Sequence, residues 1–249
     1  YSMNQADSLQ ALQQSVQRLQ GIPWVNTLAV DARGQALYLN QSVVPYVDAP
    51  LLAQCSDPAA GLELIVLDGS RSACNWKVDA RAAQPGIFPA QLQPSLLRGD
   101  FVQHSNDSAW MVNPAQPLRG YSPIISREDV PLGPRSRFAL QRLNRPGKIS
   151  AQDLHHMVMD DKVYLAELAL PDLLQWCKGA TADPQLKAVC DSLAAWDGKA
   201  GLASGIGLVH FQNILQALQE HGEFWRVAFD PADPQHTPRG LALERAEVA

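Results

Sequence analysis

Apolar residues near the start of the chain recur at helical spacing and predict a helix capped by Asp7 or Ser8. The residues that fall on its apolar face are Leu9, Leu12, Val16 and Leu19. Gly21 and Pro23 follow directly. Because a proline cannot continue a helix, we expect the helix to end there.

A second pattern predicts a β-hairpin. Residues 24–30 are rich in β-forming side chains, Asp31 and Gly34 supply turn residues, and residues 36–39 return. The chain that follows, up to residue 93, is punctuated by proline and glycine.

One apolar run, residues 62–67, interrupts this punctuated stretch. A run of that length fits either a strand or a short helix.

Helical spacing returns in the second half of the chain. Ser150 and Asp153 resemble a capping box with Asp in place of Glu. The apolar positions that follow at helical spacing are Leu154, Met157, Val158, Leu165 and Leu168. We expect Pro171 to interrupt this helix.

Two more helices are predicted after that proline. Asp183 followed by Pro184 is a cap with a first-turn proline, and Asp197-Gly198 stops the apolar repeat. The last helix is expected at about residues 205–221, and residues 231–239 are expected to form a loop.

Residues 103–110 have neither a helical nor an alternating period. They form a dense run of turn formers and hydrogen-bonding side chains, entered from Phe101-Val102 and closed by Trp110. Such a run changes the direction of the backbone and can aim polar groups into a cleft. On composition alone, an ordinary surface loop explains it.

Composition limits the class of protein. The chain has 249 residues, 46% of them apolar, which is enough for one large domain or a substantial part of one. Its net charge is −5 with no basic stripe, so we do not expect a nucleic-acid partner. No apolar run approaches the roughly 20 residues that span a bilayer, so we expect no membrane partner. The opening Tyr1-Ser2-Met3 is interpreted as a fragment or a processed product.

Four short motifs carry a resemblance to a known family. They are Q-x-S-N-D-S-x-W at 103–110, N-P at 113–114, G-Y-S-P at 120–123 and R-x-R-F at 135–138. Together they resemble the large chain of the penicillin acylase family, and within it the acyl-homoserine-lactone and aculeacin acylases. The resemblance implies an α+β chain that is part of an αββα N-terminal nucleophile hydrolase sandwich. Residues 1–140 would be mainly strands and loops of the catalytic core, and residues 141–249 mainly helical.

The resemblance also implies a chemistry. Enzymes of this family attack an amide with an N-terminal Ser whose own α-amine accepts the proton. This chain begins with Tyr1, so Ser2 has no free amine. We therefore expect the nucleophile in another chain of the same processed precursor, with an α-chain and the Ser-initiated part of the β-chain as partners.

Two site residues are carried over from the family motif. Asn106 matches the Asn whose side-chain amide donates to the oxyanion, and Arg137 matches the Arg that orients that site. Arg135 is a second candidate for the arginine. The alternative for Asn106 is a turn residue that bonds its own backbone, and the alternative for Arg137 is a solvated residue at a helix start.

Three residues are candidates for substrate binding. Trp24 and Val25 match a Trp-Val pair that lines the acyl pocket of the long-chain acylases, although a large aromatic is often simply part of a core. His104 lies two residues before Asn106 and is expected to contact substrate or tune the site. A lone loop histidine is otherwise merely exposed.

No cofactor or metal is expected. His156 and Asp160 are four residues apart on a predicted helix, but two ligands make no site, and we interpret them as a polar helix face, with Asp161 as a candidate buried residue.

Four cysteines form two close pairs, Cys55 with Cys74 and Cys177 with Cys190. These spacings suit two disulfide loops in an exported protein or buried thiols in a cytosolic one. Because the family is largely periplasmic or secreted, the resemblance favours disulfides and that location.

The predicted reaction is hydrolysis of the amide of an N-acyl-homoserine lactone, which is quorum quenching. A penicillin or other β-lactam acylase is the alternative substrate class. A non-catalytic binding module on the same fold, and an independent helical domain with a β-hairpin, are alternatives of another kind.

Overall fold

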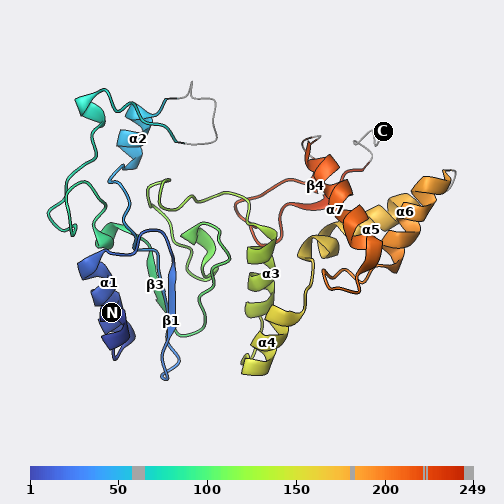
Figure 1. Ribbon diagram of the computed structural model, residues 1–249, viewed down its shortest axis with the longest axis horizontal. Coiled ribbons are helices and arrows are strands. Elements are labelled where there is room, and N and C mark those ends of the chain that lie inside the picture. The colour runs from blue at the N-terminus through green and yellow to red at the C-terminus, as the bar shows by residue number, and fades with distance from the viewer. Residues whose placement is uncertain (58–64, 180–182, 221, 223, 244–249) are drawn as a thin grey trace. The chain divides into compact units, whose positions relative to one another are not determined.

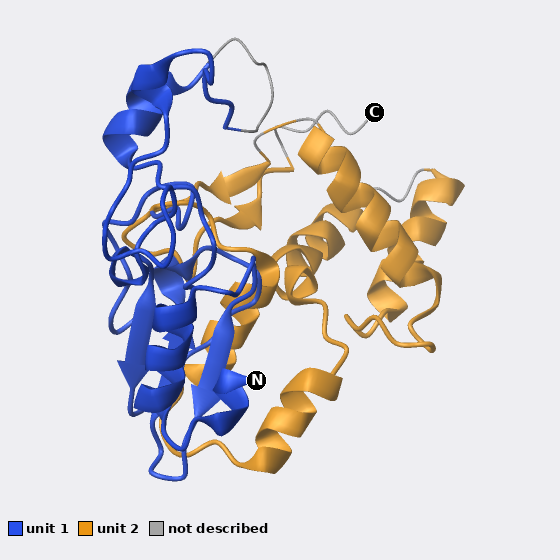
Figure 2. Ribbon diagram, turned by 60° about the vertical axis from the view of Figure 1, so that its left-hand side comes forward, with its two compact units in different colours: residues 1–128 blue, residues 129–249 orange. Residues whose placement is uncertain are grey.

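The computed structural model describes residues 1–57, 65–179, 183–220, 222 and 224–243. The chain divides into two compact units, residues 1–128 and residues 129–249 (Figure 2). Helices and small sheets occur together, so the chain is of mixed α and β structure (Figure 1). Each unit is described by itself.

The described residues of the first unit form two α-helices and one sheet. Its elements are α1 (Leu9–Leu19), β1 (Thr27–Val30), β2 (Ala36–Leu39), α2 (Ala49–Cys55) and β3 (Ser95–Arg98), with 3₁₀ turns at Ser2–Gln5, Ser72–Cys74, Ala90–Leu92 and Ala109–Met111.

The three strands form an antiparallel sheet in the order β1-β2-β3. All four residues of the central strand β2 are buried, which requires a cover on both faces. The predicted hairpin is confirmed, although its first strand begins at Thr27 rather than Trp24. No sequence pattern predicted β3.

Helix α1 covers one face of the sheet. The Ser8 hydroxyl oxygen accepts the backbone N–H of Ala11 at 3.1 Å, which confirms the predicted cap. Leu9 and Val16 then pack against Leu37 and Leu39 of β2. The helix ends at Leu19, and the C-cap residue Gln20, in the left-handed conformation, lies directly before the predicted Gly21.

The polar loop that follows β3 covers the opposite face. Tyr38 and Leu96 are register partners in β2 and β3, and they pack with Ala109, Val112 and Leu118. The predicted polar stretch is therefore anchored by its own apolar residues on a rigid sheet.

A small separate core surrounds the first disulfide, Cys55–Cys74. The Asp48 carboxylate caps α2, and Val47 and Leu51 pack against the two cysteines. Of the apolar run predicted as a strand or helix, residues 62–64 lie outside the described residues, and Leu67 makes an isolated bridge with Ser56.

The second unit is mainly helical. Its elements are α3 (Pro134–Leu143), α4 (Ala151–Met159), α5 (Tyr164–Cys177), α6 (Pro184–Ala195), α7 (Gly205–Glu220), β4 (Trp225–Val227) and β5 (Arg239–Leu241). The core between α5, α6, α7 and the short β4–β5 pair consists of Ala166, Ala169, Leu173, Leu193, Trp196, Phe211, Leu215, Leu218 and Leu241.

Two helix starts in this unit are as predicted. Ser150 and Asp153 form a reciprocal capping box at α4, and the Asp183 carboxylate accepts the backbone N–H groups of Gln185 and Leu186 at α6. The second disulfide, Cys177–Cys190, joins α5 to α6.

The prediction that Pro171 interrupts a helix is wrong, because Pro171 lies inside α5. The break falls instead between α4 and α5, where Asp161 is exposed in a left-handed conformation, contrary to the interpretation of Asp161 as buried. An internal proline costs about 3 kcal/mol. Burial of Ala169 and Leu173 on either side of it offsets that cost.

The expected last helix is confirmed as α7, but the pairing of β4 with β5 was not predicted. Where α7 meets α6, Gly207 allows the closest approach: a Cβ there would lie 2.5 Å from the Ser192 carbonyl oxygen. No described helix is both long and apolar enough to cross a membrane.

Candidate functional site

The loop that carries the family-like motif is held by its own side chains. Gln103 is buried; its Nε2 donates to the carbonyl of Met111 at 3.1 Å and its backbone N–H donates to the carbonyl of Val112 at 3.1 Å. Ser105 donates to Gln103 Oε1 at 3.2 Å. These bonds join the two sides of the loop across residues 104–110.

A second set of bonds fixes the base of the loop. The buried Asn113 amide donates to the carbonyl of Phe101 at 2.8 Å and to the carboxylate of Asp100 at 3.2 Å. The Ser108 hydroxyl contacts the Ser126 hydroxyl at 2.8 Å and also donates to the carbonyl of Arg127. The loop thus has internal hydrogen bonds of the kind that hold a polar group in position.

Asn106 lies at the exposed tip of this loop with a φ of 67°. Among non-glycine residues, asparagine is one of the few that adopt this left-handed conformation readily. The positive φ is therefore by itself a reason for an asparagine at this position. This agrees with the alternative interpretation of Asn106 as a turn residue. The same geometry holds the side chain at the surface of a rigid loop.

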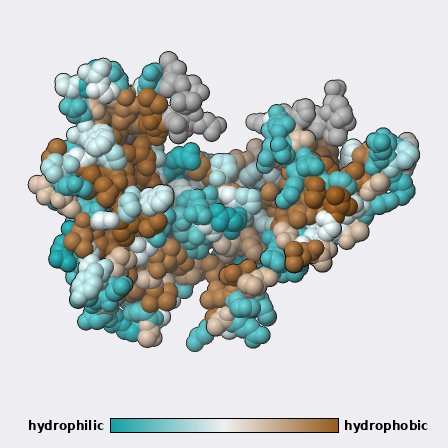
Figure 3. Space-filling model, viewed as in Figure 1, coloured by the Kyte–Doolittle hydropathy of each residue, from teal (hydrophilic) through white to brown (hydrophobic). Residues whose placement is uncertain are grey.

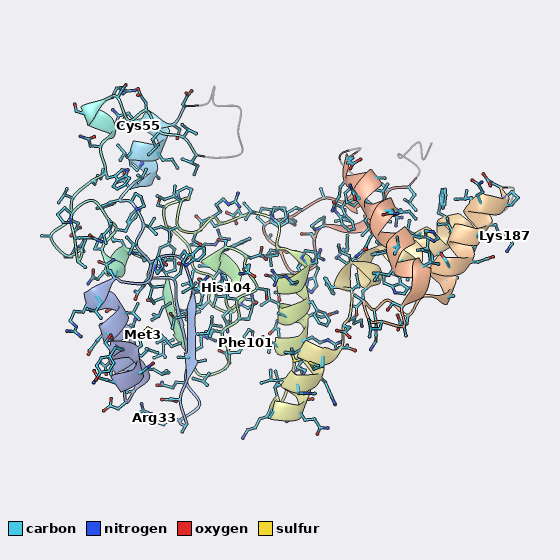
Figure 4. The ribbon with its side chains drawn as sticks, viewed as in Figure 1. Met3, Arg33, Cys55, Phe101, His104 and Lys187 are labelled. Atoms are coloured by element: carbon cyan, nitrogen blue, oxygen red, sulfur yellow. A yellow bond between two sulfur atoms is a disulfide. The ribbon has the colours of Figure 1, made fainter. Side chains whose placement is uncertain are left out.

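His104 connects this tip to the sheet. Its ring stacks on the ring of Tyr38 with centroids 5.5 Å apart and planes 21° apart. The Tyr38 hydroxyl in turn donates to Asn26 Oδ1 at 2.6 Å. Figure 4 shows His104 within the first unit, close to the strands. The interpretation of His104 as a merely exposed loop residue is therefore wrong.

Burial shifts the pKa values of both stacked rings. It lowers the pKa of His104, against the opposing effects of the Asp107 backbone and carboxylate. It raises the pKa of Tyr38, with a smaller contribution from Tyr121. Both shifts favour the neutral rings.

Trp24 and Val25 lie at the surface of the first unit. Trp24 is 82% exposed and Val25 is 51% exposed, so the interpretation of Trp24 as a core residue is wrong. Figure 3 shows that hydrophobic residues reach the molecular surface, and Trp24 and Val25 are among the exposed large hydrophobic residues. Two neighbouring apolar side chains that are this exposed are suited to contact another chain or an acyl group.

The alternative interpretation of Arg137 as a solvated residue at a helix start is wrong, because Arg137 is only 4% exposed. Its Nε donates to the carbonyl of Gln235 at 3.0 Å, its Nη1 donates to the carbonyl of Pro238 at 2.8 Å, and its guanidinium lies over the ring of Tyr164. Arg135, the second candidate, is exposed. These contacts lie within the second unit, and the role of Arg137 in orienting Asn106 stays a prediction.

The pair His156 and Asp160 lines a cavity of about 430 Å³ beside α4. Asp160 accepts from Lys199 at 2.7 Å and lies 3.5 Å from Arg142 Nη2. Among the described residues, no group of three or more His, Cys, Asp or Glu side chains is placed to hold a metal ion.

Sequence reasoning missed the supports of the loop. Gln103 and Asn113 were seen only as parts of motifs, and Tyr38 only as part of a hairpin. The available signal was chemical: a buried amide side chain needs hydrogen-bond partners, so polar residues between apolar ones indicate internal bonding. The partners themselves lie too far apart in the sequence to be deduced from it.

Comparison with known proteins agrees with the motif. The family model for penicillin amidase matches residues 1–248. An acyl-homoserine lactone acylase PvdQ from Pseudomonas putida is 70% identical over 249 residues, which is 100% of this chain and 32% of that protein. The PvdQ acylase from Pseudomonas fluorescens strain Pf0-1 is 62% identical over 252 residues, again 100% of this chain and 32% of that protein.

A more distant relative is aculeacin-A acylase from Actinoplanes utahensis. It is 36% identical over 260 residues, covering 95% of this chain and 32% of that protein. The chain thus spans about a third of the length of the curated relatives that it matches.

Proposed function

We propose that this chain, which belongs to the penicillin amidase family, forms part of an amide hydrolase that acts on N-acyl-homoserine lactones. The proposal rests mainly on the 70% identity to an acyl-homoserine lactone acylase, which extends over the whole chain. A penicillin or other β-lactam acylase is the alternative, which the penicillin amidase family match and the 36% identity to aculeacin-A acylase fit only distantly.

In this proposal, Asn106 supplies an oxyanion donor. Amide hydrolysis needs a nucleophile, a base and a donor aimed at the charge that develops on the carbonyl oxygen. Asn106 is neutral, carries an amide donor and lies at the exposed tip of a braced loop. Removing one such donor from a comparable hydrolase costs about 3–4 kcal/mol of transition-state stabilisation.

Trp24 and Val25 form part of the acyl pocket in the same proposal. Their exposure leaves apolar surface to which a fatty acyl chain can bind. Arg137 would act indirectly, by fixing the loop of residues 235–238 through its two carbonyl bonds.

The catalytic serine would be supplied by another chain of the same precursor. The sheet of the first unit would then contribute to an αββα sandwich. A periplasmic or secreted location is supported by the two disulfides, because such bonds persist in oxidising compartments. Quorum quenching is the biological role that this substrate class would give.

The test uses the complete processed enzyme and replaces Asn106 in two ways. Asn106→Gly removes the amide yet tolerates the positive φ, and Asn106→Asp keeps the shape but loses the donor. We expect turnover of an N-acyl-homoserine lactone to fall about 100-fold or more in both variants, with folding retained. Asn75→Ala, at an exposed asparagine elsewhere in the first unit, serves as the control and is expected to keep wild-type turnover.

Near-wild-type turnover of Asn106→Gly would remove Asn106 from the reaction. If the unsubstituted enzyme cleaved penicillins but not N-acyl-homoserine lactones, the β-lactam alternative would replace the proposed substrate. A complete enzyme without turnover of either class would leave a binding module as the better description.

A further inference from the structure

We infer that His104 is a positioning residue that holds the backbone of Asn106, rather than a residue that binds substrate. This inference rests on the proposed role of Asn106 as an oxyanion donor. The observation behind it is that the backbone N–H of Asn106 donates to Nδ1 of His104 at 3.3 Å.

This contact is made by the backbone of Asn106, the residue at the tip of the loop. Asn106 is the residue of the loop tip with a positive φ, and its N–H points back to the side chain two residues earlier. Asparagine and aspartate side chains stabilise turns in the same way, by accepting the N–H two residues ahead. The imidazole of His104 therefore acts as the acceptor of a turn that sets the direction of the Asn106 side chain.

The position of His104 is in turn set by the sheet. The ring lies on Tyr38, which is fully buried in the central strand, and the Tyr38 hydroxyl is fixed by Asn26. A path of direct contacts thus leads from the hairpin to the tip of the loop. His104 is half-buried in this arrangement, and the ring face that lies on Tyr38 is covered by that contact.

The protonation of His104 agrees with this role. A ring nitrogen accepts a hydrogen bond only when it carries no proton, so Nδ1 is the acceptor when the neutral ring is protonated at Nε2. Burial, which lowers the pKa of His104, favours that neutral form.

The test separates the acceptor from the stacked ring. In the complete processed enzyme, His104→Phe keeps an aromatic ring on Tyr38 but removes the acceptor, whereas His104→Asn restores an acceptor for the N–H two residues ahead. Because a misplacement of about 1 Å can cost about 100-fold in rate, we expect His104→Phe to lower kcat about 10- to 100-fold with KM within about threefold. We expect His104→Asn to recover most of that loss.

A second measurement does not depend on the chemistry. Hydrogen exchange of the peptide that covers residues 101–112 should become faster in His104→Phe and return toward the wild-type rate in His104→Asn. If Asn106→Gly has normal turnover, the proposed function fails, and this exchange experiment still tests whether His104 holds the loop.

Three outcomes would overturn the inference. The first is a His104→Phe variant with wild-type kcat and exchange, which would mean that the ring acts only by packing. The second is a rise in KM without loss of kcat, which would make His104 a substrate contact. The third is a full additional loss of kcat from His104→Phe in the Asn106→Gly background, because a residue that acts through the Asn106 side chain cannot add to its removal.

Discussion

Arg137 and Pro238 are joined by a hydrogen bond, in which the guanidinium Nη1 donates to the main-chain carbonyl oxygen at 2.8 Å. A second bond from Nε reaches the carbonyl of Gln235. One buried side chain of α3 therefore fixes the loop that leads into β5. Whatever role Arg137 has in catalysis, this contact gives it a structural role within the second unit.

Replacing Arg137 with methionine should destabilise the protein. Arg137→Met keeps most of the apolar stem but leaves two carbonyls without the charged donor, and hydrogen bonds to charged groups are worth about 1.5–3 kcal/mol each. We expect the free energy of unfolding to fall by about 2–4 kcal/mol in urea titrations. The exposed Arg18 of α1 gives the control, Arg18→Met, which is expected to change stability by less than about 0.5 kcal/mol. Equal effects of the two substitutions would contradict the structural role.

A methyl group at Gly207 should separate α6 from α7. The added Cβ would lie 2.5 Å from the Ser192 carbonyl oxygen and 2.6 Å from Trp196 Cβ, and the former is a backbone atom that cannot rotate away. We expect Gly207→Ala to lower the free energy of unfolding by about 3 kcal/mol in thermal or urea unfolding. Gly179→Ala is the control, since its Cβ would make only an ordinary contact at 3.6 Å. An unchanged unfolding curve for Gly207→Ala would show that the two helices are not packed this closely.

The capping box of α4 should weaken in acid. The Ser150 backbone and hydroxyl, followed by Arg145, lower the pKa of Asp153 from 3.8 to about 2. Because the folded-state pKa is the lower one, the stabilisation is present above pH 3.8 and is lost as the pH falls toward 2. We expect the hydrogen-exchange protection factors of α4 amides to decrease over that interval.

The control for the capping box is Asp153→Asn, which removes the titrating carboxylate. Its α4 protection factors should be lower at neutral pH and should change less between pH 4 and 2. A decrease of the same size in Asp153→Asn would assign the acid effect to other groups.

The sequence predicted those elements whose signals are local. The cap at Ser8, the box at Ser150 and Asp153, and the Asp183-Pro184 start each lie within four residues of the backbone groups that they satisfy. Such signals need no knowledge of the rest of the chain.

Elements that depend on distant partners were missed. Strand β3 has no alternating pattern, and its pairing with β2 decides its conformation. Pro171 stays within α5 because packing in the core outweighs its local preference. At the candidate site, the motif identified Asn106, but the stacking of Tyr38 on His104 joins residues whose proximity no local pattern reveals.

The two disulfides each join neighbouring cysteines along the sequence, Cys55 with Cys74 and Cys177 with Cys190. Of the three ways to pair four cysteines, this is the one in which neither bridge encloses or crosses the other. Each bridge therefore needs only its own stretch of polypeptide. The first bridge lies wholly within the first unit and the second wholly within the second unit, so neither pairing depends on the folding of the other unit.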